Sequence, residues 1–150
     1  MATDAHETVA DLLHRDGQRY TTARRGLVGM LLGLTRPATI AELGALDPEQ
    51  SQSSLYRNLS VLERCGAVHR LSSVDGVARF ELSEDLSHHH HHLVCERCGR
   101  LEDVTLPQQL EATLHRITAD LGDEHGYAVH RHALELVGVC DDCAAGRSGA

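Results

Sequence analysis

The residues best suited to chemistry gather in one short stretch, where a run of histidines leads into a pair of cysteines. The stretch reads SHHHHHLVCERCGR, from Ser87 to Arg100, and a second cysteine pair follows near the end of the chain. Two residues between paired cysteines let one turn aim both sulfurs at one ion, and two such turns complete a tetrahedron for Zn(II). We therefore predict a structural zinc ion held by Cys95, Cys98, Cys140 and Cys143.

Because sulfur would fill all four positions around this ion, the predicted zinc site is structural and has no open position for catalysis. Two Cys-x-x-Cys pairs also favour bound metal over disulfide bonds. The fifth cysteine, Cys65, stands at the end of a helical pattern, in LERCG. We expect it to be a small core residue rather than a metal ligand.

The histidine run leads into Leu93 and Val94 and is predicted to be a strand. On a strand, successive side chains point to opposite faces. One face would carry His88, His90 and His92, and the other would carry His89 and His91. The run is therefore expected to supply half of each of two separate metal sites.

Each of these half-sites needs further ligands from elsewhere in the chain. For the first face, the candidates stand in the first half of the chain at His69 and Glu81. For the second face, they stand in the second half at Glu111 and His132. Two further acids of interest as ligands are Glu102 and Asp103.

The elements that must position these residues fall into two halves. The first half carries four helical patterns, over residues 4–16, 22–34, 40–46 and 53–65. Two strand patterns follow, over residues 67–71 and 77–82, and the Asp75-Gly76 pair between them favours a hairpin turn. Helices followed by a two-stranded wing are typical of a winged helix-turn-helix, so we predict such a DNA-binding domain over residues 1–83.

In such a domain the fourth helix would enter the major groove of double-stranded DNA. Its exposed face would present small hydrogen-bonding side chains, an aromatic ring and an arginine, including Ser54, Tyr56 and Arg57. Arg19 and Arg24, around the start of the second helix, are placed to reach phosphates or the minor groove. The alternative is a polar helix face that meets only solvent.

The second half is predicted to be an α/β unit over residues 88–150, joined to the first by a hinge at residues 84–87. It would contain the histidine strand, the cysteine turn, a further strand, a helix over residues 107–121 and a strand over residues 131–139. The expected fold class is therefore α+β, a winged-helix domain followed by an α/β dimerisation domain.

Charge is divided unevenly between these halves, within a net charge of -8. Residues 15–79 hold nine arginines and six acidic residues, whereas residues 84–150 hold five arginines and twelve acidic residues. A mildly basic first half is compatible with DNA binding. The longest apolar run, residues 26–34, is too short to span a bilayer, and residues 1–16 are polar and acidic. We expect a cytoplasmic protein with no membrane partner.

Five stretches of the chain match a known family pattern when they are taken together: LYRNLSVLERCGAV, RFEL, HHHHHLVCERCG, HGYAVHRHALEL and the terminal CDDC. They resemble the ferric uptake regulator family, which includes zinc-, nickel-, manganese- and peroxide-sensing relatives. The resemblance runs from about residue 15 to residue 143. It implies a homodimeric transcription regulator whose acidic half dimerises. It also implies that a metal in the hinge closes the dimer, so that both winged helices grip a palindromic, AT-rich operator.

The same resemblance implies roles for individual residues. The four paired cysteines match structural zinc ligands. A sensory site in the hinge is matched by Glu81, His90 and His92. A second site within the dimerisation domain is matched by His89, His91, Glu111 and His132. DNA contacts are matched by Arg24, Tyr56 and Arg57.

Departures from the family's pattern bear on which metal is sensed. Iron sensors commonly place a histidine between the second and third helices, where this chain has TRPATI. Zinc sensors often use an acid where this chain has His69. A site of His69, Glu81, His90 and His92 would offer three nitrogens and one oxygen, which suits Zn(II) and does not exclude Fe(II). We expect a zinc-responsive repressor of metal uptake genes, with an iron(II)-, nickel- or peroxide-type regulator as the alternative.

Two rival functions belong to other classes of protein. A metallochaperone or metal store would also carry histidine and cysteine clusters, but it has no need of a winged helix with Tyr56 and Arg57 exposed. A zinc hydrolase needs an open metal position beside a general base, and the chain has no H-E-x-x-H motif. We therefore expect a protein that is not an enzyme.

Overall fold

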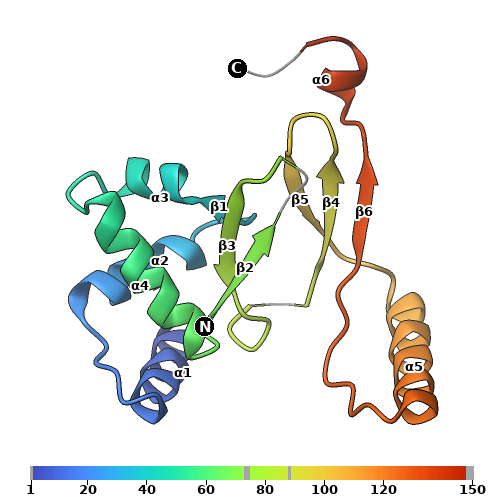
Figure 1. The fold of residues 1–150 in the computed structure, drawn as a ribbon, viewed down its shortest axis with the longest axis horizontal. Coiled ribbons are helices and arrows are strands. Elements are labelled where there is room, and N and C mark those ends of the chain that lie inside the picture. Colours follow the sequence, from blue (N-terminus) through green and yellow to red (C-terminus); the bar gives the residue numbers. More distant parts are fainter. Residues whose placement is uncertain (1, 73–74, 88, 148–150) are drawn as a thin grey trace.

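The computed structural model describes residues 2–72, 75–87 and 89–147 and consists of a helical first half and a second half built on a small sheet (Figure 1). His88, predicted to face the same way as His90, lies outside the described residues. The first half contains α1 (Ala2–Arg15), α2 (Thr22–Leu32), β1 (Ala38–Thr39), α3 (Ile40–Leu46), α4 (Gln52–Arg64), β2 (Val68–Ser72) and β3 (Ala78–Leu82). The second half contains β4 (His91–Cys95), β5 (Leu101–Val104), α5 (Gln108–His125), β6 (Glu135–Gly138) and α6 (Asp141–Ala144).

Hydroxyl side chains cap the N-termini of three helices of the first half. The side chains of Thr21, Thr39 and Ser51 each accept a hydrogen bond from the backbone N–H three residues later. At α3 the pairing is reciprocal, because Glu42 accepts in return from the backbone N–H of Thr39 at 2.7 Å. These caps satisfy backbone donors that a helix start otherwise leaves without partners. They place the start of α4, the predicted recognition helix, at a defined point.

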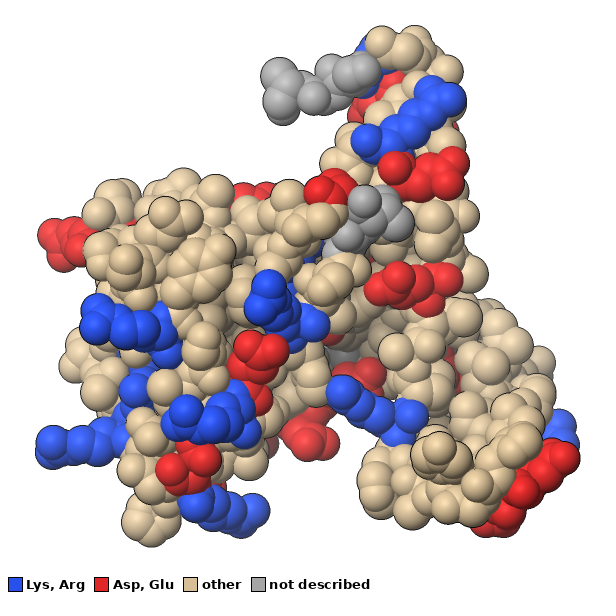
Figure 2. Space-filling view, in the orientation of Figure 1, with Lys and Arg blue, Asp and Glu red and all other residues tan. Residues whose placement is uncertain are grey.

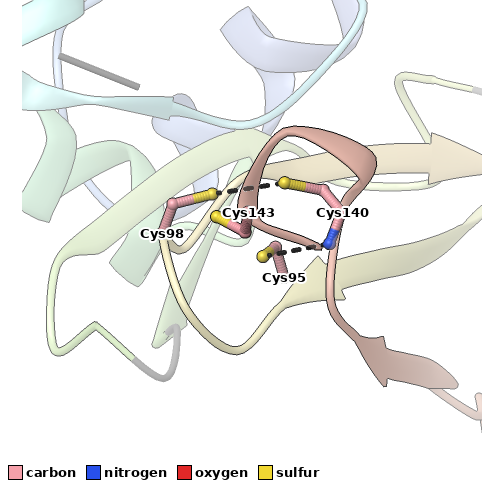
Figure 3. Close-up of side chains that lie close together, drawn as sticks. All are labelled: Cys95, Cys98, Cys140 and Cys143. Carbon is pink, nitrogen blue, oxygen red and sulfur yellow. Dashed lines mark hydrogen bonds between the residues drawn. The ribbon is translucent and has the colours of Figure 1, made fainter. Parts of the chain in front are cut away.

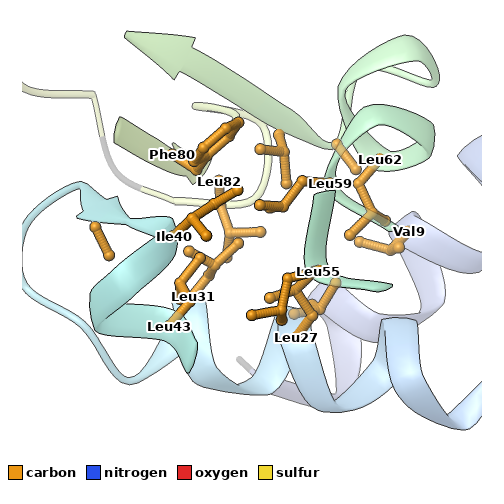
Figure 4. Close-up of a cluster of buried hydrophobic side chains, with 14 of the residues drawn as sticks. Val9, Leu27, Leu31, Ile40, Leu43, Leu55, Leu59, Leu62, Phe80 and Leu82 are labelled. Carbon is orange, nitrogen blue, oxygen red and sulfur yellow. The ribbon is translucent and has the colours of Figure 1, made fainter. Parts of the chain in front are cut away.

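One apolar core holds the first half together, and Figure 4 shows leucines from three helices meeting strand β3. Leu55, Leu59 and Leu62 form the buried stripe of α4 that the sequence predicts, and each is at most 1% exposed. They pack with Leu27 of α2 and Phe80 of β3. Each fully buried leucine contributes roughly 1.5–3 kcal/mol relative to an exposed one. This packing fixes α4 against the wing.

The wing is a small antiparallel sheet with strand order β1-β3-β2, so β3 lies in the middle. Glu81 of β3 stands opposite His69 of β2, and Arg79 stands opposite Leu71. The two-residue strand β1 pairs with the other edge of β3 through Ala38 and Thr39. Sequence patterns did not predict β1, because a two-residue strand is too short to show an alternation of apolar and polar residues.

The second half is built on a sheet with strand order β5-β4-β6. β4 pairs antiparallel with β5, and it pairs in parallel with β6. Parallel neighbours need a long crossover, and α5 supplies it. The crossover helix runs to His125, beyond the predicted end at Leu121, and stops at Gly126 with φ of 75°. Strand β6 is shorter than predicted, and the short helix α6 was not predicted.

An apolar surface remains exposed on the second half. Leu110, Ile117 and Leu121 line α5 and are 42–48% exposed. Leu93 of β4 and Leu136 of β6 stand opposite each other in the sheet and are also exposed. A set of large apolar side chains of this kind is typical of a surface that another protein covers. Among the described residues, no helix combines the length and the apolar character needed to cross a membrane.

Candidate metal centres

Four cysteines converge at the far end of the second sheet, as Figure 3 shows. Cys95 ends β4 and Cys98 lies in the following turn, whereas Cys140 and Cys143 flank the start of α6. Their sulfurs all lie within 4.8 Å of one another, and Cys98 Sγ is 3.8 Å from Cys140 Sγ. Four sulfurs at the usual Zn–S distance of about 2.3 Å form a tetrahedron with edges of about 3.8 Å. The donor set and its spacing therefore fit Zn(II).

The protein environment prepares one of these thiols as a thiolate. The backbone N–H of Cys140 donates to Cys95 Sγ at 3.3 Å, and together with the N–H of Cys98 it lowers the pKa of Cys95 to about 6. Hydrogen bonds with the thiols of Cys98 and Cys140 instead raise the pKa of Cys143 to about 12. Zinc binding requires deprotonated sulfur, so loading this site releases protons.

A second cluster, which we call the hinge cluster, joins the two halves of the chain beside residues 84–87, the predicted hinge. Glu81 Oε2 of β3 lies 3.0 Å from His90 Nε2 and 3.1 Å from His92 Nε2. Asp103 of β5 is the fourth member, with carboxylate oxygens 3.9 Å from each of these two ring nitrogens. One ligand atom from each of the four residues lies within 4.8 Å of all the others. Two imidazoles and two carboxylates at this spacing fit a divalent transition metal.

In this hinge cluster the two imidazole rings offset the negative charge of the two carboxylates only in part. Burial raises the pKa of Glu81, but hydrogen bonds with His92 and His90 outweigh it, so the pKa lies below its ordinary value. Burial also raises the pKa of Asp103, and the neighbouring Glu81 carboxylate adds to that increase against the opposing effect of His90. A bound dication would relieve the repulsion between these two carboxylates.

The structure corrects one predicted ligand of the hinge cluster. His69 was expected to complete it, but the ring of His69 faces Arg131 instead, whose Nη1 lies 3.1 Å from His69 Nδ1. Asp103 takes the fourth place because β4 and β5 pair around the cysteine turn, which sets Asp103 opposite His92. The sequence contained this signal, since His92 and Asp103 are equally far from the turn closed by Cys95 and Arg100. Asp103 is among the acids of interest in the sequence, but without a pairing between the two strands it could not be assigned to this cluster.

A third cluster lies on the opposite face of β4. Glu111 of α5 brings Oε1 to 2.7 Å from His91 Nε2, while its Oε2 lies 3.2 Å from His89 Nε2. His132 Nε2 lies 3.3 Å from the same Oε2. That nitrogen of His132 is buried and makes no hydrogen bond with the described residues, so a metal ion would satisfy it. The four predicted members, His89, His91, Glu111 and His132, are all brought together.

In this third cluster too, neighbouring histidines lower the pKa of a partly buried glutamate. Burial raises the pKa of Glu111, but the hydrogen bond with His91 and the charges of His91 and His89 prevail and lower it. Glu84 of the hinge approaches the other side of His89, with Oε1 3.1 Å from Nδ1. Because His91 and His92 are neighbours on a strand, they point to opposite faces, and the two histidine clusters are separate.

The predicted DNA-contacting residues lie on the first half. Tyr56 is 48% exposed on α4, and Arg57 beside it is exposed, with its Nε donating to the Ser53 carbonyl at 3.3 Å. Arg24 is half-buried, because its Nε donates to Asn58 Oδ1 of α4 at 3.3 Å and its Nη1 donates to the Arg19 carbonyl. Arginines gather on this half of the visible face in Figure 2, at its left.

Comparisons with known proteins agree with this geometry. The ferric uptake regulator family model matches residues 15–137. The chain belongs to the ferric uptake regulator family. The peroxide-responsive repressor PerR of Staphylococcus aureus is 31% identical over 144 residues, which cover 93% of this chain and 91% of that protein.

Solved structures of this family share the fold. The Helicobacter pylori ferric uptake regulator, described as having three functional metal-binding sites, matches with a TM-score of 0.73, 20% identity and coverage of 96% of this chain and 94% of that one. A zinc-bound manganese uptake regulator matches with a TM-score of 0.61, 30% identity and coverage of 89% and 98%. The Campylobacter jejuni peroxide stress regulator matches with a TM-score of 0.64, 22% identity and coverage of 81% and 88%.

Membership of the family settles the class of function. The chain has the family's N-terminal winged-helix DNA-binding domain and C-terminal dimerisation domain. This confirms the fold class that the sequence predicted. It is a metal-responsive transcription regulator rather than an enzyme. Regulators of this family bind DNA and act as dimers.

Proposed function

We propose that this protein is a metal-dependent repressor in which an ion in the hinge cluster ties the winged-helix domain to the dimerisation domain. The observation that carries the proposal is that the ligands of this cluster come from both domains. Glu81 belongs to the wing, whereas His90, His92 and Asp103 belong to the second half. One ion held by all four restrains the angle between the two domains.

This restraint acts on DNA affinity through entropy. Without the ion, a hinge at residues 84–87 would let domains 1–83 and 88–150 sample many orientations. In a dimer, only some of these set both α4 helices at the spacing of successive major grooves. Metal binding offsets the entropy cost of restricting the domains to these orientations, so operator affinity rises with metal occupancy.

The assembly we propose is a homodimer on double-stranded DNA. The exposed apolar side chains of α5, together with Leu93 and Leu136, offer a surface that a second copy would cover. A two-fold dimer reads two equivalent half-sites, so its operator is palindromic. Arg19, Arg24, Ser54, Tyr56 and Arg57 are the proposed DNA contacts, and an AT-rich operator follows from the family resemblance alone. A repressor of this kind acts in the cytoplasm, where the DNA is.

Zn(II) is the sensory metal that we propose first. All four hinge ligand atoms lie within 4.8 Å of one another, which suits a compact, four-coordinate ion. Imidazole and carboxylate are both common zinc ligands in tetrahedral sites. In the same protein the four-cysteine cluster would hold a second Zn(II) as a structural ion.

Fe(II) is the second candidate, and one observation favours it. Asp103 replaces His69 in the hinge cluster, so the site offers two nitrogens and two oxygens rather than three nitrogens and one oxygen. Each oxygen that replaces a nitrogen makes a site more suitable for harder ions such as Fe(II). The similarity to a peroxide-responsive repressor and to a manganese uptake regulator is compatible with this alternative.

Fluorescence anisotropy on DNA from upstream of the protein's own gene tests the proposal and separates the metals. The protein is titrated in buffers that fix free Zn(II) or, without oxygen, free Fe(II). DNA binding at subnanomolar free Zn(II), with Fe(II) needed at far higher levels, supports the zinc proposal. Binding at micromolar Fe(II), while zinc fills only the cysteine cluster, supports iron. Metal uptake with no metal-dependent DNA binding on this or other promoters supports a metal store instead.

A further inference from the structure

Residues 75–77, which we call the wing turn, precede strand β3 and lie against the turn that holds Cys95 and Cys98. We call residues 95–99 the zinc knuckle. Gly99 has φ of 70°, and a Cβ built on it would overlap the carboxylate of Asp75, 2.5 Å from its Cγ. Asp75 precedes β3, and the described residues that lead into β3 lie close to the β4–β5 hairpin in Figure 1. The two domains therefore touch at a point where only glycine fits.

Asp75 cannot simply turn away from this contact, because three hydrogen bonds hold its carboxylate. Arg79 grips its carboxylate with two hydrogen bonds, Nη1 to Oδ1 at 3.0 Å and Nη2 to Oδ2 at 2.8 Å. The backbone N–H of Val77 donates to Oδ1 at 2.9 Å. Two parallel bonds between a guanidinium and a carboxylate fix both direction and distance.

The location of Arg79 is unusual for an arginine on a DNA-binding wing. It is only 8% exposed, so it is not available to phosphates. It lies on the middle strand β3, between Thr39 of β1 and Leu71 of β2. The hydrogen bond with Asp75 raises the pKa of Arg79 above its ordinary value, so the guanidinium stays charged. Arg79 thus supports the wing turn from within the wing, through the carboxylate of Asp75.

Strand β3 therefore meets the second half at two places. Glu81 reaches the hinge cluster, and Arg79, two residues earlier, supports the contact of Asp75 with Gly99. One metal ion fixes one point of the winged-helix domain and leaves it free to rotate about that point. A second contact removes much of this rotation.

We propose that docking of the wing turn on the zinc knuckle is a further attachment point, besides the hinge metal and the contact of His69 with Arg131, that orients the DNA-binding domain in the metal-loaded protein. The inference rests on the proposed hinge-metal mechanism and extends it. Asp75 and Arg79 are positioning residues, and Gly99 is the residue against which Asp75 packs. The four-cysteine cluster then does more than stabilise its own domain, because it shapes the surface against which the wing rests.

The test uses the zinc-loaded, full-length protein and two substitutions. Gly99→Ala forces the wing turn away from the knuckle, whereas Gly126→Ala has a similar backbone cost, with φ of 75° and nothing within 4 Å of the new Cβ. Operator affinity is measured by anisotropy at saturating free metal. We expect Gly99→Ala to weaken binding about 10-fold, within the usual range for coupling between sites, while Gly126→Ala leaves binding unchanged.

A double-substitution cycle with Asp75→Ser shows whether the loss comes from this contact. Gly99→Ala should cost much less in the Asp75→Ser background, since residues in contact are not additive. The amide resonance of Gly99 should also shift on Asp75→Ser, whereas that of Gly126 should not. Equal affinities of the two glycine variants, or additive losses in the cycle, overturn the inference. Absence of metal-dependent binding by the unsubstituted protein would instead overturn the proposed function.

Discussion

Glu81 and His90 lie on opposite sides of the hinge, and their side chains meet with Oε2 3.0 Å from Nε2. The carboxylate comes from the middle strand of the wing, so its position follows the position of the recognition helix through the shared core. The imidazole comes from the histidine run of the second half. In the mechanism that we propose, a metal ion bound to both side chains restrains the orientation of the DNA-binding domain, so that this orientation depends on the metal concentration.

Loss of one hinge ligand should uncouple metal from DNA. His90→Ala removes a nitrogen from the hinge cluster and should lower the affinity of the sensory metal by at least about 100-fold, because even residues that only orient ligands are worth 10–100-fold. Metal-buffered anisotropy measures the effect. The dimer should remain folded, as judged by sedimentation. His125→Ala is the control, since His125 is exposed and outside the three clusters. Full metal dependence in His90→Ala would refute this assignment.

Loss of one zinc cysteine should instead affect stability. Cys98→Ser breaks the four-cysteine site and should remove one zinc ion per chain, because three ligands hold zinc less tightly. If the loss costs about 3 kcal/mol, the thermal midpoint falls by about 6–12 °C. Elemental analysis and calorimetry measure the two effects.

Cys65→Ser is the matched control for that experiment. Cys65 lies outside the zinc cluster, and its Sγ donates to the Leu62 carbonyl at 3.3 Å, a bond that serine can keep. Zinc content should be unchanged in this variant. An unaltered zinc content in Cys98→Ser would show that the cluster does not hold the ion.

Two glycine substitutions in helices should change stability in opposite directions. A Cβ at Gly122 of α5 would lie 2.7 Å from the Tyr127 carbonyl oxygen and 2.9 Å from Val129 Cγ2. Gly122→Ala should therefore destabilise the protein by about 1–3 kcal/mol, the usual cost of overpacking. A Cβ at Gly29 of α2 would meet no atom within 4 Å outside the backbone of its own helix. Gly29→Ala should therefore stabilise the protein by about 0.5–1 kcal/mol through helix propensity. Urea unfolding measures both, and equal signs would contradict the packing around α5.

The recognition helix offers a prediction about salt. Arg57→Ala should weaken operator binding by the metal-loaded protein and reduce the slope of log affinity against log salt by about one, if Arg57 neutralises one phosphate. Arg116→Ala, on the exposed surface of α5, should change neither quantity. Anisotropy at several salt concentrations gives both slopes. An identical slope for the two variants would remove Arg57 from the interface.

The sequence alone determined the parts that depend on local spacing. Each Cys-x-x-Cys spacing sets the geometry of its own pair, and the parallel pairing of β4 with β6 then brings the two pairs together. Alternation along a strand separated His90 and His92 from His89 and His91, and the structure keeps the two pairs apart. Capping residues and leucine spacing located the helices of the first half to within a few residues, because each of these signals acts within a turn or two of helix.

Tertiary structure alone decided the choice between His69 and Asp103. Both residues can bind metal, and both lie on strands next to residues of the hinge cluster. The pairing of β4 with β5 brings Asp103 toward the hinge cluster. The ring of His69 instead contacts Arg131, which lies in a loop far along the chain. The contact of Asp75 with Gly99 likewise depends on how the two domains meet. The contacts of His69 with Arg131 and of Asp75 with Gly99 join residues distant in sequence. No local pattern encodes them, because they arise only when separately folded elements pack together.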